Sequence, residues 1–88
     1  SKKEEFVRNG ITFNTISPGP ILIENTGWGD FKKKNKKEYN KWINENIPLN
    51  RIGTPEDVSN IVTFLCSNNG SFINGQNIKV DGGQSNNA

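Results

Sequence analysis

The chain has 88 residues, of which 31% are hydrophobic, and its mean hydropathy of -0.74 indicates a small core for an independent domain. Its 11 Lys and Arg residues against 9 Asp and Glu residues give a net charge of +2, which gives no reason to expect a nucleic acid or a membrane as partner. One cysteine and no histidine exclude an internal disulfide and leave a metal site without support, so we expect a cytoplasmic protein that binds no metal.

The first elements are a helix end and a strand. Residues 1–9 have the pattern of the last turns of a helix, and Asn9-Gly10 is a strong stop signal. Residues 11–17 are mostly β-branched or aromatic and end at Pro18, which predicts a short strand. The imperfect alternation is typical of a strand that is covered on both faces in a parallel sheet.

A long excursion follows this strand. Prolines and glycines predict a loop over residues 18–30. Residues 31–46 are polar, with Tyr39, Trp42 and Ile43 at the i, i+3, i+4 spacing that places side chains on one face of a helix.

The strongest local signal comes after a connector at residues 47–53. Thr54 as N-cap, Pro55 at the first helical position and Asp57 at the third predict a helix over 54–66 with a variant of the capping box. Its apolar residues follow helical spacing and predict one buried stripe, made of Val58, Ile61, Val62 and Leu65.

The end of the chain is predicted to be a second strand. Polar and apolar residues alternate over 76–81, Gly82-Gly83 predicts a tight turn, and residues 84–88 are expected to be frayed. Cys66 is expected to be a small buried residue without special reactivity.

Strand, helix and strand in this order predict a parallel pair joined by a crossover. Two strands and two or three helices cannot cover one another, so the pattern indicates one end of a larger α/β sheet.

Three motifs resemble one family. NGITFNTISPGPI (residues 9–21) resembles the sixth strand of the short-chain dehydrogenase/reductases and the turn that follows it. IPLNRIGTPEDVSNIVTFLCSN (47–68) resembles their PLGRxGxPEEVAxxVxFLxS helix, and SFINGQNIKVDGG (71–83) resembles their last strand. SPGPILIENTGWGDFKKKN (17–35) is most similar to the subset related to 3-oxoacyl-(acyl-carrier-protein) reductases.

The resemblance implies the C-terminal part, residues 1–88, of a Rossmann-type doubly wound parallel sheet that binds NAD or NADP and moves a hydride between nicotinamide and a carbonyl/alcohol pair. A complete member has roughly 250 residues, so we expect about the last third of a domain. The Gly-rich phosphate-binding turn and the catalytic Ser and Tyr-x-x-x-Lys set are not in this sequence, since Tyr39 is followed four positions later by Ile43. We therefore expect the chain alone to be inactive.

The resemblance also implies a cofactor edge. Ligands of open α/β sheets bind at the carboxyl ends of strands, and in the family the turn after this strand passes the nicotinamide. The implied cofactor-binding residues are Pro18, Gly19, Pro20 and Ile21, with the backbone of Ile21 holding the carboxamide. Many relatives have a threonine at the position of Ile23, and Thr26 is the candidate to replace its hydroxyl.

Residues 18–46 are expected to form the cofactor edge and a substrate loop, with Leu22, Ile23, Thr26, Trp28, Phe31 and Trp42 as its candidate residues. The aromatic residues either line a substrate pocket or lid, or anchor the excursion on its own core or at a subunit contact. The basic run Lys32–Lys37 is either a landing site for an acidic carrier or phosphate-bearing thioester, or a solvated helix face.

Family members commonly form tetramers, so residues 58–66 and 76–83 are expected to face a partner subunit in a homotetramer or homodimer. The expected substrate is a small molecule or an acyl thioester. The alternative hypothesis is a non-catalytic interaction or oligomerisation module.

Overall fold

A computed structural model describes residues 1–86 of the chain. In chain order the elements are α1 (Lys2–Arg8), β1 (Thr15–Pro18), α2 (Gly27–Lys34), α3 (Lys36–Asn46), α4 (Pro55–Cys66), the 3-10 turn η1 (Asn68–Gly70), β2 (Asn77–Val80) and the 3-10 turn η2 (Gln84–Asn86).

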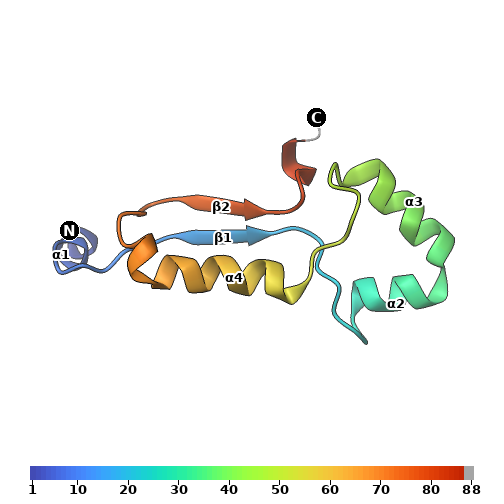
Figure 1. The fold of residues 1–88 in the computed structure, drawn as a ribbon, viewed down its shortest axis with the longest axis horizontal. Helices are drawn as coiled ribbons and strands as arrows, with labels where there is room; N and C mark the ends of the chain where they lie inside the picture. The colour runs from blue at the N-terminus through green and yellow to red at the C-terminus, as the bar shows by residue number, and fades with distance from the viewer. Residues whose placement is uncertain (87–88) are drawn as a thin grey trace.

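The two strands form a parallel pair, as the sequence predicted. Thr15 is opposite Asn77 and Pro18 is opposite Val80. Both strands run in the same direction, with α4 alongside β1, α1 at their amino ends, and α2 and α3 as a separate arm near their carboxyl ends (Figure 1). This α/β arrangement matches the expected last two strands and crossover helix of a larger parallel sheet.

The first strand is shorter than the predicted 11–17. Around residues 13 and 14, side-chain amides replace ladder bonds: the Phe13 N–H donates to Asn74 Oδ1 (2.9 Å), and the Asn14 amide donates to the Ile73 carbonyl (3.1 Å). The Asn14 side-chain oxygen also accepts from the Gln76 N–H (3.0 Å). Asparagine side chains compete with backbone pairing in this way, so regular β1 begins only at Thr15.

The excursion contains two helices where we predicted a loop over 18–30 and one helix over 31–46. Helix α2 begins earlier, at Gly27, and the chain breaks at Asn35, which ends α2 and caps α3 with its side chain on the Glu38 N–H (3.2 Å). An asparagine is among the best N-cap residues. The helical signal at residues 36–46 was therefore read correctly, whereas the break was missed.

Helix α4 begins with the predicted capping box. Thr54 accepts from the Asp57 N–H (3.3 Å), and Asp57 accepts from the Thr54 N–H (2.8 Å). The predicted buried stripe is wrong for this chain: no α4 residue is buried, and Val62 is exposed. Cys66 is exposed as well, contrary to expectation. Among the described residues, helix α4 makes its main contacts with β1 and η1.

The second strand, β2, is one residue shorter at each end than the predicted 76–81. The tight turn after it is present, with Gly82 and Gly83 at φ values of 62° and 90°, in the region that glycine adopts without strain. Gln84–Asn86 form η2 and are not frayed, and residues 87–88 lie outside the described part of the chain.

The buried core among the described residues consists of Tyr39, Ile43 and Ile47, all in or next to α3. The radius of gyration is 16.6 Å, against about 12 Å for a compact domain of this length. The accessible surface is 6621 Å², against about 5,200 Å² expected for a folded monomer of 9.8 kDa. The sheet therefore exposes surface that a complete domain would bury.

Candidate functional site

The predicted cofactor edge lies where β1 leaves the sheet. The Gly19 N–H donates to the Val80 carbonyl (3.0 Å), which extends the pairing one residue beyond β1. Residues 20–22 then pair with Gly53 in the connector before α4, because the Gly53 N–H donates to the Pro20 carbonyl (3.0 Å) and the Leu22 N–H donates to the Gly53 carbonyl (2.9 Å). Gly19 is thus held by β2, and residues 20–22 are held by Gly53.

Ile21 has the free backbone groups of this edge. In an extended chain, alternate residues direct their N–H and C=O groups to opposite sides. The Pro20 carbonyl and the Leu22 N–H face Gly53, so Ile21 presents its N–H and its carbonyl on the other side. Neither group has a hydrogen-bond partner among the described residues. One donor and one acceptor, side by side, match the acceptor and donor of a primary carboxamide.

Two glycines make this edge close-packed. A Cβ on Gly19 would lie 2.6 Å from Asp81 Cβ and 2.8 Å from Asp81 Cα. A Cβ on Gly53 would lie 2.7 Å from Ile21 Cδ1 and 3.2 Å from the Pro20 carbonyl oxygen. Side chains larger than hydrogen would separate the strand ends, so these glycines set the position of Ile21.

The predicted cofactor residues do not all face one hollow. Pro18, Ile21 and Ile23 line an open, largely apolar hollow together with the first turns of α4 (Pro55, Val58, Ser59, Val62 and Thr63). Pro20 lines a different hollow, between residues 47–51 and the turn after β2. Of these two hollows, only the first is lined by Ile21.

The Thr26 hydroxyl is already engaged. It donates to the Ile23 carbonyl (2.7 Å) and closes the turn at Asn25, whose φ is 59°. Its proton is thus used inside the loop, so the expected role of Thr26 toward a cofactor would require this hydrogen bond to be exchanged. Ile23 itself is half exposed, and Leu22 is half buried.

The aromatic side chains of the predicted substrate loop pack on one another. The Trp28 ring lies 4.6 Å from that of Trp42 and 6.1 Å from that of Phe31, between ring centroids. Phe31 lies edge-on to Tyr39 at 5.8 Å, and all of these rings rest on the core of α3. The structure thus places Trp28, Phe31 and Trp42 as anchors of the arm on its own core, and none of them lines the hollow at Ile21.

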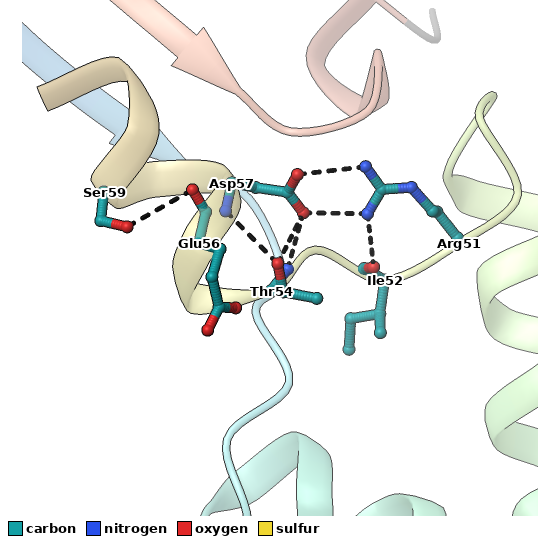
Figure 2. A network of polar contacts seen from close by, with 6 residues as sticks. All are labelled: Arg51, Ile52, Thr54, Glu56, Asp57 and Ser59. Carbon is teal, nitrogen blue, oxygen red and sulfur yellow. Dashed lines mark hydrogen bonds and ion pairs between the residues drawn. The ribbon is translucent and has the colours of Figure 1, made fainter. Parts of the chain in front are cut away.

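An ion pair that the sequence analysis did not single out fixes the start of α4 (Figure 2). Arg51 donates to both carboxylate oxygens of Asp57 (2.9 and 3.2 Å) and to the Ile52 carbonyl (3.2 Å). Hydrogen bonds from Arg51 and from Thr54 hold the pKa of Asp57 well below its usual range. The bidentate geometry orients the connector before Gly53, and an arginine six residues before a capping aspartate is the signal that could have predicted it.

A second carboxylate holds the other side of the edge. Asp81 accepts from the N–H groups of Gly83 (3.0 Å) and Ser85 (3.1 Å) and thereby orders the turn into η2. Hydrogen bonds, first from the Ser85 side chain and then from these N–H groups, lower the pKa of Asp81. Because Gly19 rests against Asp81, this turn is a support of the cofactor edge.

Tyr39 is unsuited to proton transfer with a ligand. Its side chain is 4% exposed, and burial raises its pKa.

Residues 1–86 contain no group of three His, Cys, Asp or Glu side chains placed to hold a metal ion. Over the same residues, no helix has the length and apolarity needed to cross a membrane.

Comparison with known proteins identifies the chain's relatives. A family model described as enoyl-(acyl carrier protein) reductase matches residues 4–85. The isoepoxydon dehydrogenase of Penicillium expansum is 43% identical over 77 residues, which are 84% of this chain and 28% of that protein. The 3-oxoacyl-(acyl-carrier-protein) reductase FabG of Buchnera aphidicola is 43% identical over 79 residues, 90% of this chain and 30% of that protein.

Solved structures agree with these relatives. A 4-hydroxyisoleucine dehydrogenase complexed with NADH superposes with a TM-score of 0.81 and 31% identity, over 99% of this chain and 34% of that one. A putative 2-deoxy-D-gluconate 3-dehydrogenase from Agrobacterium tumefaciens with bound NADP gives 0.76 and 33% identity, over 97% and 33%.

The 88 residues span less than a third of the length of the curated relatives they match. Within that span, the match covers every element from α1 to β2. The chain therefore belongs to the short-chain dehydrogenase/reductase family, and its parallel strands and crossover helix have the fold of the C-terminal part of the family's Rossmann-type sheet.

Proposed function

We propose that this sequence supplies the nicotinamide edge of an oxidoreductase that uses NAD or NADP and acts on a carbonyl/alcohol pair. The structural relatives named above are complexes with NADH or NADP, and the family relatives are dehydrogenases and reductases. The observation that carries the proposal is the pair of free backbone groups on Ile21 beside an apolar hollow.

The residues present fit a nicotinamide. Its carboxamide offers one acceptor and two donors, which the Ile21 N–H and carbonyl can satisfy. The apolar side chains of Pro18, Ile21 and Ile23 supply a wall for the ring and exclude water from one side. When bound, the cofactor would supply or accept the hydride, and this chain's contribution would be to hold the ring in a fixed orientation.

In this proposal, the proton relay is not formed by residues of this chain. Tyr39 is buried in the core of the arm, and the chain has no other tyrosine. We assign the Ser, Tyr and Lys roles to the part of the relatives' length that these 88 residues do not span. The α2–α3 arm, together with residues 22–26, is proposed to cover the substrate, for which a 3-oxoacyl thioester is our candidate because a reductase of that class is among the relatives.

The test uses the longest polypeptide that the gene encodes. Ile21→Pro removes the N–H, whereas Ile21→Val keeps the backbone groups and serves as the control. We expect NADH or NADPH to bind about tenfold more weakly to Ile21→Pro, since an unpaired carboxamide oxygen costs roughly 1–3 kcal/mol. Equal affinities of the two variants, measured by cofactor fluorescence titration, would contradict the proposed edge.

A second candidate, a non-catalytic interaction module, is favoured by the exposed area. The excess over a compact monomer is about 1,400 Å² on one chain, more than the roughly 800 Å² that each partner buries in a standard protein interface. Residues 58–66 and 76–83 are the surfaces we propose for a homodimer or homotetramer. Size-exclusion chromatography and intact mass distinguish the candidates, because an 88-residue product that assembles and binds no cofactor fits only the module.

A further inference from the structure

The arm formed by α2 and α3 concentrates the positive charge of the chain. Over residues 27–46, six lysines stand against three carboxylates, a net charge of +3, whereas the whole chain has +2. The rest of the chain is thus slightly acidic. The lysines are Lys32, Lys33, Lys34, Lys36, Lys37 and Lys41.

Five of these lysines meet at the break between the two helices. Lys32–Lys34 form the last turn of α2, and Lys36 and Lys37 form the first positions of α3 after Asn35. We call Lys32–Lys34 and Lys36–Lys37 the lysine corner. Its backbone is held in place by the aromatic cluster beneath it, and Lys32 lies over the Tyr39 ring at 5.9 Å.

The charges of the lysine corner are not neutralised within the described part of the chain. Of the arm's lysines, only Lys41 has an ion-pair partner, Glu45 at 4.0 Å. Lys36 and Lys37 also stand at the positive end of the α3 dipole, where cations are unfavourable. Helix α1 begins with two lysines too, but two glutamates follow them directly. Helix stability therefore accounts for Lys32–Lys34 in the last turn of α2, where cations are favourable, but not for Lys36 and Lys37.

We propose that the lysine corner is a docking surface for an acidic surface of a partner protein. None of the hollows at the cofactor edge is lined by these lysines, which are exposed on the arm. The arm's aromatic rings are packed inward and provide no platform for stacked bases or for insertion into a bilayer. An exposed cationic surface fits the carboxylates of a partner helix and speeds encounter by electrostatic steering.

The test pairs two equal charge reversals in the longest polypeptide that the gene encodes. Lys36→Glu/Lys37→Glu changes the first turn of α3, and Lys2→Glu/Lys3→Glu changes the first turn of α1. Both change the charge by the same amount at the same helical positions. The probe is fluorescently labelled acyl carrier protein, an acidic helical protein, titrated at several salt concentrations, with circular dichroism to confirm equal folding.

We expect binding that weakens as salt rises, is roughly tenfold weaker in the α3 variant at low salt, and changes less than about twofold in the α1 control. The affinity of the Lys36→Gln/Lys37→Gln variant should lie between those of the two charge reversals. Absence of binding, or equal loss in both reversals, would overturn the proposal. So would binding only to vesicles of equal parts phosphatidylcholine and phosphatidylserine, which would make the corner a lipid site. The choice of acyl carrier protein as probe rests on the proposed 3-oxoacyl thioester substrate. Because no cofactor enters this measurement, a loss of docking is distinguished from a failure of the proposed nicotinamide edge, which the cofactor titration of the Ile21 variants tests separately.

Discussion

Replacing Gly19 by alanine tests the packing that positions the cofactor edge. The new Cβ would lie 2.6 Å from Asp81 Cβ and 2.8 Å from Asp81 Cα, whereas carbon atoms prefer about 3.5–4.0 Å. The turn after β1 and the turn after β2 must therefore separate by about 1 Å. Asp81 has little freedom to yield, because its carboxylate is hydrogen-bonded to Gly83 and Ser85. Overpacking of this kind costs about 1–3 kcal/mol.

The assay is urea unfolding of the longest polypeptide that the gene encodes, followed by cofactor titration of the folded variant. Gly27→Ala is the matched control, because its Cβ meets nothing within 4 Å at the exposed start of α2; it should be neutral or stabilise by up to about 1 kcal/mol. A Gly19→Ala variant within about 0.5 kcal/mol of wild type, with unchanged cofactor affinity, would refute the idea that this contact sets the edge.

Three further outcomes follow from the structure. Asn14→Ala should lower stability by about 1–3 kcal/mol in urea unfolding, because two hydrogen bonds to segment 73–76 are lost; Asn60→Ala, which removes no such bond, should not. Asp57→Asn should destabilise at neutral pH but not in strong acid: the folded pKa is depressed, so the stabilisation is complete above the unfolded pKa of about 4 and is lost as the pH falls below it. Urea unfolding at both pH values checks this, with Glu56→Gln showing no comparable pH dependence. The isolated 88-residue chain should show no cooperative thermal transition by calorimetry, since only three of its described residues form a buried core; a sharp melt of the monomer would contradict this.

Short sequence motifs were sufficient to predict interactions between residues that are close together in the sequence. The capping box of Thr54 and Asp57 lies within one turn of α4, and the pattern of a proline and acidic residues predicted it in full. The tight turn at Gly82-Gly83 was predicted for the same reason. The parallel pairing also followed from the sequence, since a long helical connection between two strands leaves few other arrangements.

Interactions between distant segments could not be predicted. The shortening of β1 depends on Asn14 and Asn74, which are 60 positions apart in the sequence. Their roles can be recognised only when the two strands have been aligned. The requirement for glycine at position 19 arises from Asp81, which lies next to it only in the folded chain. The Arg51–Asp57 pair is nearer in sequence, yet its bidentate geometry depends on how the connector turns.

The sequence alone determined the family, the parallel strand–helix–strand order and the capping box of α4, because these depend on short motifs and on backbone propensities. Only the tertiary structure decided which groups of the turn after β1 are free. Gly53 takes the backbone bonds of Pro20 and Leu22 and leaves those of Ile21 available. The tertiary structure also decided that Trp28, Phe31 and Trp42 pack on the arm's own core. The spacing of apolar side chains along the sequence is the same whether they face a ligand or one another, and only the fold brings their partners together.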